Sequence, residues 1–111
     1  MYIEYGINAQ KPITFSATDD DNNVLSDVDF DEIIMTCRLT PHKQSPVLFE
    51  KKLSKQEITY DNEAKEFVID IKNEDIVDLD YREYGFGIWY KQGDYQDEAT
   101  GTLKITEGYK E

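Results

Sequence analysis

The strongest constraint on the fold is a pair of strand-like runs in the last third of the chain, between Leu79 and Thr106. Apolar and aromatic residues occupy alternate positions from Tyr84 to Tyr90, and after a polar loop a second alternating run begins at Thr100. A period of two residues predicts extended strands, and two such runs joined by a loop predict a β-hairpin. Neither run contains reactive side chains in an arrangement typical of a catalytic site. The hairpin therefore predicts a β domain and argues against an enzyme.

Five further segments show the same strand signals, at residues 13–18, 33–39, 47–53, 58–60 and 66–72. Their alternation predicts a shared inward face made by Ile13, Phe15, Ala17, Ile33, Met35, Cys37, Leu39, Val47, Phe49, Leu53, Phe67, Ile69 and Ile71. Residues 73–79 begin with an asparagine followed by acids, which predicts one short helical turn before the penultimate strand.

The number and spacing of these signals predict an all-β fold. About seven strands, with turn signals every eight to twelve or so residues, are typical of an antiparallel β-sandwich. No helix long enough for a parallel crossover is evident in the sequence. A closed barrel has the same alternation and stays open as an alternative. The chain of 111 residues contains no repeat or linker, so we expect a single domain over residues 1–111.

Tyr84 lies at the start of the penultimate strand, five residues after Leu79. Immunoglobulin-like domains often carry a tyrosine there, and its hydroxyl bonds the corner that precedes the strand. We therefore predict a tyrosine corner formed by Tyr84 and Leu79. The alternative is that Tyr84 is an ordinary core aromatic, one of eight tyrosines in the chain.

Gly85, Gly87 and Trp89 share the face of this strand opposite the alternating aromatic residues. Glycine weakens a strand interior unless another group packs closely against it, such as an aromatic from a neighbouring strand or a partner subunit. We interpret these three residues as a candidate interaction face, on which Trp89 would form an exposed aromatic platform. The alternative is that Trp89 covers its own sheet.

Acidic residues outnumber basic ones by 24 to 12, which gives a formal net charge of −12. Such a charge repels phosphate backbones and anionic lipid surfaces, so we expect neither a nucleic-acid partner nor a membrane partner. The charge serves solubility, or it forms an acidic face that meets a basic partner. The amino terminus lacks the basic and apolar regions of a signal peptide, which predicts synthesis in the cytoplasm.

Candidate groups for metal or covalent chemistry are few. Cys37 is the only cysteine and lies in phase with apolar residues, which predicts a buried and inert thiol. His42 is the only histidine, and its position between two prolines predicts an exposed loop. The acidic loop from Asp19 to Asp31 does not fit an EF-hand, because Val24 stands where glycine is required. We predict no catalytic residue, no metal site and no cofactor, and calcium binding by the acidic loop stays open.

Several segments, taken in order, resemble a known family. They are the strand at residues 13–17, the Asp/Asn turn after it, the segment at residues 25–28, the turn at 74–79, the tyrosine-rich strand and the final strand at 100–106. This order is similar to small immunoglobulin-like β-sandwich domains of tailed-bacteriophage structural proteins, in baseplate, neck and head-decoration components. Two departures are residues 10–12, where the family often has a glycine, and Asn22–Asn23 in place of a turn glycine. The second departure is mild, because asparagine adopts the same left-handed backbone.

The resemblance implies a non-catalytic module of a phage or prophage virion, made in the host cytoplasm. Its partners would be other virion proteins or further copies of itself, bound through sheet edges and loops. Two other classes stay open. One is a carbohydrate- or ligand-binding β-sandwich that uses Trp89 and nearby tyrosines, and the other is an acidic inhibitor that occludes a basic site on a host protein.

Overall fold

Strands account for most of the regular structure in the computed structural model, which describes residues 2–7 and 11–107. The strands are β1 (Tyr2–Gly6), β2 (Ile13–Phe15), β3 (Ala17–Thr18), β4 (Val24–Leu25), β5 (Glu32–Arg38), β6 (Val47–Lys52), β7 (Ile58–Asp61), β8 (Glu66–Ile69), β9 (Glu83–Gln92) and β10 (Tyr95–Thr106). A short 3-10 helix spans Asp27–Asp29, and the α-helix α1 spans Asn73–Ile76. The all-β prediction and the helical turn before the penultimate strand are both confirmed.

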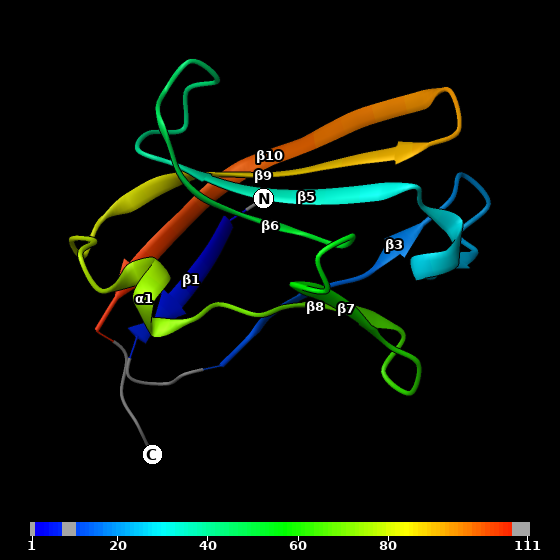
Figure 1. Ribbon diagram of the computed structural model, residues 1–111, viewed down its shortest axis with the longest axis horizontal. Helices are drawn as coiled ribbons and strands as arrows, with labels where there is room; N and C mark the ends of the chain where they lie inside the picture. Colours follow the sequence, from blue (N-terminus) through cyan, green and yellow to red (C-terminus); the bar gives the residue numbers. More distant parts are fainter. Residues whose placement is uncertain (1, 8–10, 108–111) are drawn as a thin grey trace.

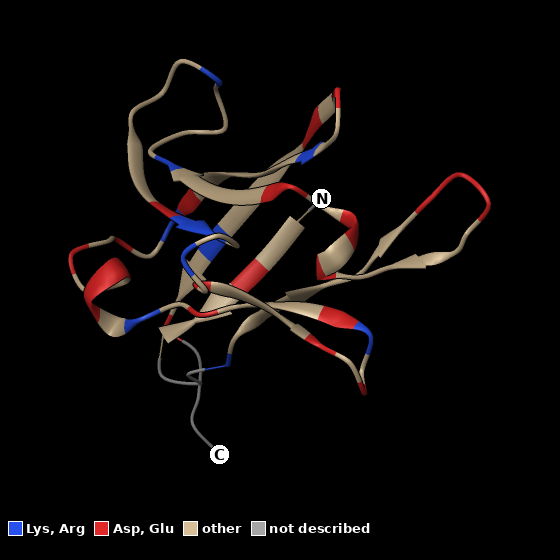
Figure 2. Ribbon diagram, turned by 45° about the vertical axis from the view of Figure 1, so that its right-hand side comes forward, with Lys and Arg blue, Asp and Glu red and all other residues tan. Residues whose placement is uncertain are grey.

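Two sheets form layers around the core (Figure 1). The larger sheet has the strand order β1-β10-β9-β5-β6, and the smaller has the order β2-β8-β7. β3 and β4 pair only with each other, as a separate hairpin that extends beyond the two layers (Figures 1 and 2). The predicted terminal hairpin is β9 and β10, which remain paired from the Tyr95–Gln92 pair to the Lys104–Glu83 pair.

The prediction of purely antiparallel sheets is wrong at β1, which runs parallel to β10. Tyr2 pairs with Thr102 and Gly6 pairs with Thr106, so the first described strand lies beside the last. A parallel pair needs a long connection between its strands. Here the connection is nearly the whole chain, so no crossover helix is required.

The single strand predicted at residues 13–18 is instead two strands in different sheets. β2 pairs with β8 in the smaller sheet, whereas β3 pairs with β4 in the separate hairpin. Alternation continues through both strands, because Phe15 and Ala17 are both partly buried against the core. Periodicity reports which face a residue occupies and does not report which strand is its neighbour.

One buried cluster between the sheets contains six residues of the predicted inward face: Ile13, Ile33, Met35, Cys37, Phe67 and Ile69. Its members are Tyr5, Ile13, Ile33, Met35, Cys37, Ile58, Phe67, Ile69, Ile76, Tyr84, Phe86, Ile88, Leu103 and Ile105. Full burial of one such aliphatic or aromatic side chain contributes roughly 1.5–3 kcal/mol. The ring of Phe67 is fully buried and stacks on Phe15 with ring centroids 5.1 Å apart. The cluster joins both sheets and α1 in one core.

Two predicted inward residues point outward, and one charged residue points inward. Leu39 is 39% exposed and Val47 is 46% exposed. The register shifts between Cys37 and Arg38, so that an irregularity in the β5–β6 pair interrupts the alternation on which the prediction relied.

Lys51 is buried and its Nζ lies 2.6 Å from Asp75 Oδ2 in α1. The ion pair satisfies a charge that would otherwise be costly to bury.

Candidate interaction surface

The outer face of the larger sheet carries the predicted interaction face. Tyr84, Phe86 and Ile88 are buried on the inner face of β9, so the intervening Gly85, Gly87 and Trp89 lie on the outer face. Trp89 pairs with Ile34 of β5 on one side and with Glu98 of β10 on the other. The strand register therefore assembles a surface from three neighbouring strands.

Gly85 is covered by the loop that follows β5. A Cβ atom at Gly85 would overlap the carbonyl oxygen of Thr40, and it would lie 2.9 Å from the Thr40 carbonyl carbon and 3.0 Å from Pro41 Cα. At Gly87 the nearest group is the Glu98 carboxylate, whose Cδ would lie 3.3 Å from such a Cβ. The close packing expected at these glycines comes from the chain itself, through a loop and a glutamate rather than an aromatic ring. Trp89 is left as the partly exposed residue of the three.

A cavity of about 240 Å³ lies between this loop and the sheet. Its lining includes both glycines, the threonines of β5 and β10, and the charged or titratable side chains of Arg38, His42, Lys43 and Glu98. Arg38 Nη1 donates to the carbonyl of Ser45 at 3.0 Å, which holds the far end of the loop. Sequence reasoning missed that the loop between Pro41 and Pro46 returns over the sheet. Nothing in its local composition specifies that direction.

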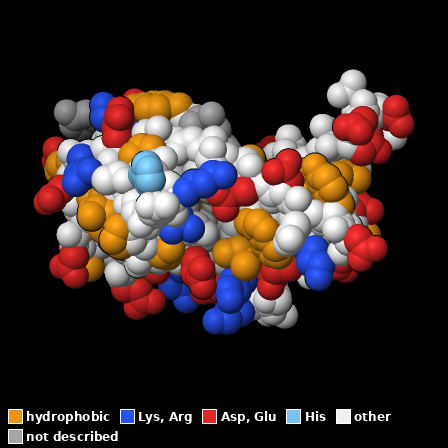
Figure 3. Space-filling model, turned by 90° about the horizontal axis from the view of Figure 1, so that it is seen from above, with side chains coloured by type: hydrophobic (Ala, Val, Ile, Leu, Met, Phe, Trp, Pro, Cys, Tyr) orange, Lys and Arg blue, Asp and Glu red, His pale blue; other side chains and the backbone are white. Residues whose placement is uncertain are grey.

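Trp89 and Ile34 form a small apolar area with a charged surround. Both side chains are partly exposed, and neighbouring outward positions on β5, β9 and β10 carry Glu32, Lys91 and Glu98. Figure 3 shows the molecule from above, with apolar side chains in separate patches between acidic and basic ones. A partly exposed tryptophan within a polar rim is a common arrangement at protein–protein contacts.

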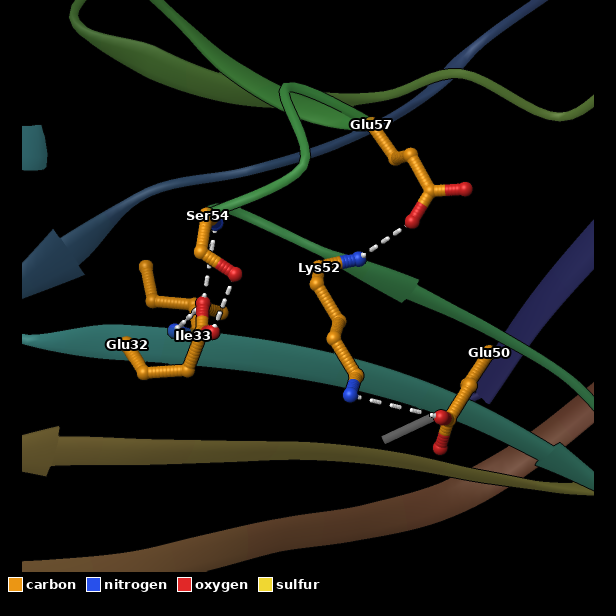
Figure 4. A network of polar contacts seen from close by, with 6 residues as sticks. All are labelled: Glu32, Ile33, Glu50, Lys52, Ser54 and Glu57. Atoms are coloured by element: carbon orange, nitrogen blue, oxygen red, sulfur yellow. Dashed lines mark hydrogen bonds and ion pairs between the residues drawn. The ribbon is translucent and has the colours of Figure 1, made fainter.

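A hydrogen-bond network fixes the edge of this sheet between β5 and the turn after β6 (Figure 4). Glu32 accepts hydrogen bonds from the backbone N–H groups of Ile33 and Ser54, both at 3.0 Å, and from the Ser54 hydroxyl. Partial burial of Glu32 acts to raise its pKa, but these bonds favour the carboxylate, and the pKa is lowered overall. On the more exposed side of β6, Lys52 Nζ lies 3.7 Å from Glu50 Oε1.

Tyr84 bonds the corner that precedes β9. Its side chain is buried, and its hydroxyl donates to the backbone carbonyl of Asp80 at 3.0 Å. Leu79 is partly buried and its own N–H donates to the carbonyl of Ile76, at the end of α1. The acceptor of the tyrosine hydroxyl is therefore the residue after Leu79 in the same corner.

Cys37 and His42 occupy the environments expected from the sequence. Cys37 is buried in the core, and burial raises the pKa of its thiol to about 12, so the reactive thiolate is strongly disfavoured at neutral pH. His42 is exposed, and its Nδ1 accepts a hydrogen bond of 3.2 Å from the backbone N–H of Gln44.

The acidic loop uses its first carboxylate to close a turn. Asp19 Oδ1 accepts the backbone N–H groups of Asp21 and Asn23, both at 2.9 Å, and Asp19 Oδ2 accepts the Asn23 side-chain amide at 3.1 Å. Asn22 has a φ of 65°, the left-handed backbone that a turn glycine would supply. Within residues 2–7 and 11–107 no group of three or more potential metal-ligating side chains is present. Titration calorimetry with calcium tests the open question directly.

A second and larger groove lies on the inner side of the β9–β10 hairpin. It has a volume of about 630 Å³ and opens between this hairpin and the segment that runs from β2 into β3. Apolar side chains make up much of its wall: Phe15, Ala17, Leu25, Phe30, Ile33, Ile88, Tyr90, Tyr95 and Ala99. Sequence reasoning missed this groove, because the alternation marks Phe15, Ala17 and Ile33 as inward and cannot show that the two layers are open at one side.

No helix in the described part of the chain is both long and apolar enough to cross a membrane. The chain matches no protein-family model, and neither a curated protein nor a solved structure is similar to it.

Proposed function

We propose that this chain is an immunoglobulin-like β-sandwich that acts as a non-catalytic structural module of a phage or prophage virion, in a baseplate, neck or head-decoration component. The order of segments described above supports the family, and the hydrogen bond from Tyr84 to the corner before β9 is compatible with it. The partners are virion proteins or further copies of the chain. The module is made in the host cytoplasm and ends in the virion.

The observation that carries the proposal is the outer face of β9, where Trp89 lies between Ile34 and Glu98. Large aromatic side chains at the centre of a contact surface dominate many protein–protein interfaces. The cavity next to this face gives no support to an enzyme, because its histidine lies in an exposed loop and its Nδ1 accepts a hydrogen bond from the backbone N–H of Gln44.

Purified virions of the source phage or prophage provide the direct test. We expect an antibody against this chain to detect it in the particles, and we expect the chain to capture a virion protein from dissociated particles. Trp89→Ala should weaken that capture about tenfold or more. Tyr81→Ala removes an aromatic side chain that is 62% exposed on the turn before β9 and should leave capture unchanged.

Absence from the particles, together with a strictly monomeric state in light scattering and no captured virion protein, would overturn the proposal. Hits on a glycan array would favour the carbohydrate-binding alternative instead. That alternative relied on Trp89 and nearby tyrosines, but Tyr90 and Tyr95 line the groove on the inner face of the hairpin. Trp89 therefore lacks these two tyrosines as neighbours on its own face.

A further inference from the structure

β10 has a free edge over more than half of its length. β9 pairs along one side of β10 from Tyr95 to Lys104. β1 pairs along the other side only from Thr102 to Thr106. Among the described residues, no strand pairs with this second side at residues 95–101. The backbone N–H and C=O groups of such an edge are a template for an additional strand.

The large groove opens directly beside this free edge. Tyr95 and Ala99 belong to the edge and also line the groove, and both are exposed. Deeper in the groove, Phe15, Phe30 and Tyr90 are only partly buried. A strand paired with β10 would direct every second side chain into the groove, and it would cover these aromatic rings. The edge and the groove therefore form one site.

The charge around the site indicates what kind of strand it accepts. Asp19 and Asp20 line the groove, and no Lys or Arg is among its described lining residues. The sequence between Lys11 and Arg38 contains seven acidic residues and no basic one. Figure 2 shows acidic but no basic colour at the tip of the β3–β4 hairpin. The two ion pairs found in the described chain, Lys51–Asp75 and Lys52–Glu50, use none of these acids.

We propose that residues 95–101 of β10 and the adjoining groove bind an extended, basic segment of a partner protein as an added β-strand. Alternate apolar side chains of that segment enter the groove, and Lys or Arg residues at its ends lie near Asp19 and Asp20. A second copy of this chain is a poor occupant, because its net charge of −12 opposes the same acidic surface. The inference rests on the proposed function as a protein–protein module and specifies the chemistry of the partner.

The probe is a synthetic peptide of about nine residues that alternates valine with threonine between a lysine at each end, and its termini are blocked. Backbone amide NMR of the full chain reports where it binds. We expect shifts that saturate at residues 95–101 and around the groove. A scrambled peptide of the same composition should bind more weakly, because its valines no longer share one face of a strand.

Two neighbouring substitutions on β10 separate the groove from the rest of the strand. Ala99→Arg places a cation in the groove and should weaken peptide binding about tenfold or more. Thr100→Arg makes the same change in charge one residue later, on the outer face opposite Gly87, and should leave binding within about twofold. Equal melting temperatures of the two variants would exclude misfolding as the reason for a difference.

A matched acidic pair tests the charge. Asp20 lines the groove, whereas Asp21 follows it on the same turn and does not. Asp20→Asn should weaken the lysine peptide about twofold to fivefold and reduce its salt dependence, and Asp21→Asn should do less.

Three results would overturn the inference: no binding of the alternating peptide at millimolar concentration, equal binding by the Ala99→Arg and Thr100→Arg variants, or amide shifts confined to β6. A dimer of this chain that Ala99→Arg dissolves would also overturn it, since the occupant would then be a second copy. Because the peptide assay uses neither virions nor Trp89, its failure leaves the proposed function untouched. Absence from virions would in turn leave peptide binding unaffected.

Discussion

The hydroxyl of Tyr84 donates a hydrogen bond of 3.0 Å to the backbone carbonyl of Asp80, four residues earlier in the chain. The guanidinium of Arg82 lies 5.2 Å from the centre of the same tyrosine ring, and its Nη2 donates to the carbonyl of Leu39 at 3.3 Å. The corner before β9 is thereby attached to its own strand and to the end of β5. These contacts fix the start of the longest hairpin in the fold.

Removal of this hydroxyl should cost stability without changing the core. Tyr84→Phe keeps the buried ring and removes one hydrogen bond, so we expect a loss of about 1 kcal/mol in the free energy of unfolding. The melting temperature should fall by about 4–8 °C. Tyr81→Phe, on an exposed side chain of the same corner, is the control and should change neither value. An unchanged melting temperature for Tyr84→Phe would reject the corner as a stabilising contact.

The two glycines of β9 should respond differently to the same substitution. Gly85→Ala forces a Cβ against the backbone of Thr40 and Pro41, which cannot move without displacing the loop, and overpacking of this kind costs roughly 1–3 kcal/mol. Gly87→Ala meets only the flexible end of the Glu98 side chain, so we expect a change below about 0.5 kcal/mol. Urea unfolding of both variants measures the difference. Equal losses of unfolding free energy would mean that the loop at Thr40 and Pro41 is displaced as easily as the Glu98 side chain.

The two partners of the buried ion pair should differ in how much stability is lost when each is replaced. Asp75→Ala leaves the Lys51 ammonium buried without its partner and should cost roughly 3–5 kcal/mol. Lys51→Met fills the same volume with an apolar chain, and the remaining Asp75 carboxylate still accepts the backbone N–H of Lys72 at 2.8 Å, so its cost should be smaller. Chemical denaturation of the two variants gives the comparison.

The surface pair on the same strand provides the control. Lys52 and Glu50 are 3.7 Å apart with side chains 30% and 47% exposed, so Lys52→Met should cost less than about 1 kcal/mol. A loss for Lys52→Met as large as that for Asp75→Ala would show that burial is not the cause of the difference.

Glu32 should make the protein less stable in acid. Its folded pKa is lowered, so the unfolded chain takes up a proton first as the pH falls. The stabilisation is complete above the ordinary glutamate pKa of 4.5 and is lost as the pH falls through the lower folded value. Ser54→Ala removes the hydroxyl donor and should raise the pKa of Glu32 in an NMR titration. Ser16→Ala, an exposed serine on the connection between β2 and β3, should leave that pKa unchanged.

The sequence alone predicts the parts of this fold in which one face of a strand is buried. The alternation of Ile33, Met35 and Cys37 marks the inner face of β5, and the alternation of Tyr84, Phe86 and Ile88 does so for β9. The face that each β9 residue occupies also follows from the alternation alone, and Gly85 and Trp89 therefore lie on the predicted outer face. These features depend on the two-residue alternation within each strand, which can be read from a single sequence.

The parts that could not be predicted depend on contacts between distant segments. Lys51 has the inward parity of Phe49 and Leu53, but its charge argues against burial, and the Asp75 carboxylate that makes its burial possible lies on another element. The cover over Gly85 comes from Thr40, whose direction is set by the loop as a whole. Gly85 itself carried the useful signal, since a glycine in a strand interior indicates close packing without identifying the group that packs.

The parallel pairing of β1 with β10 has a consequence for how the protein forms in the cell. Thr106 Oγ1 donates to the carbonyl of Tyr5 across 101 positions of sequence. β1 therefore stays without its neighbour in the larger sheet until residues 102–106 have left the ribosome. Such distant pairing slows folding and prolongs the exposure of strand edges. A nascent or truncated chain that stops before Leu103 should depend on chaperones that the finished protein does not need.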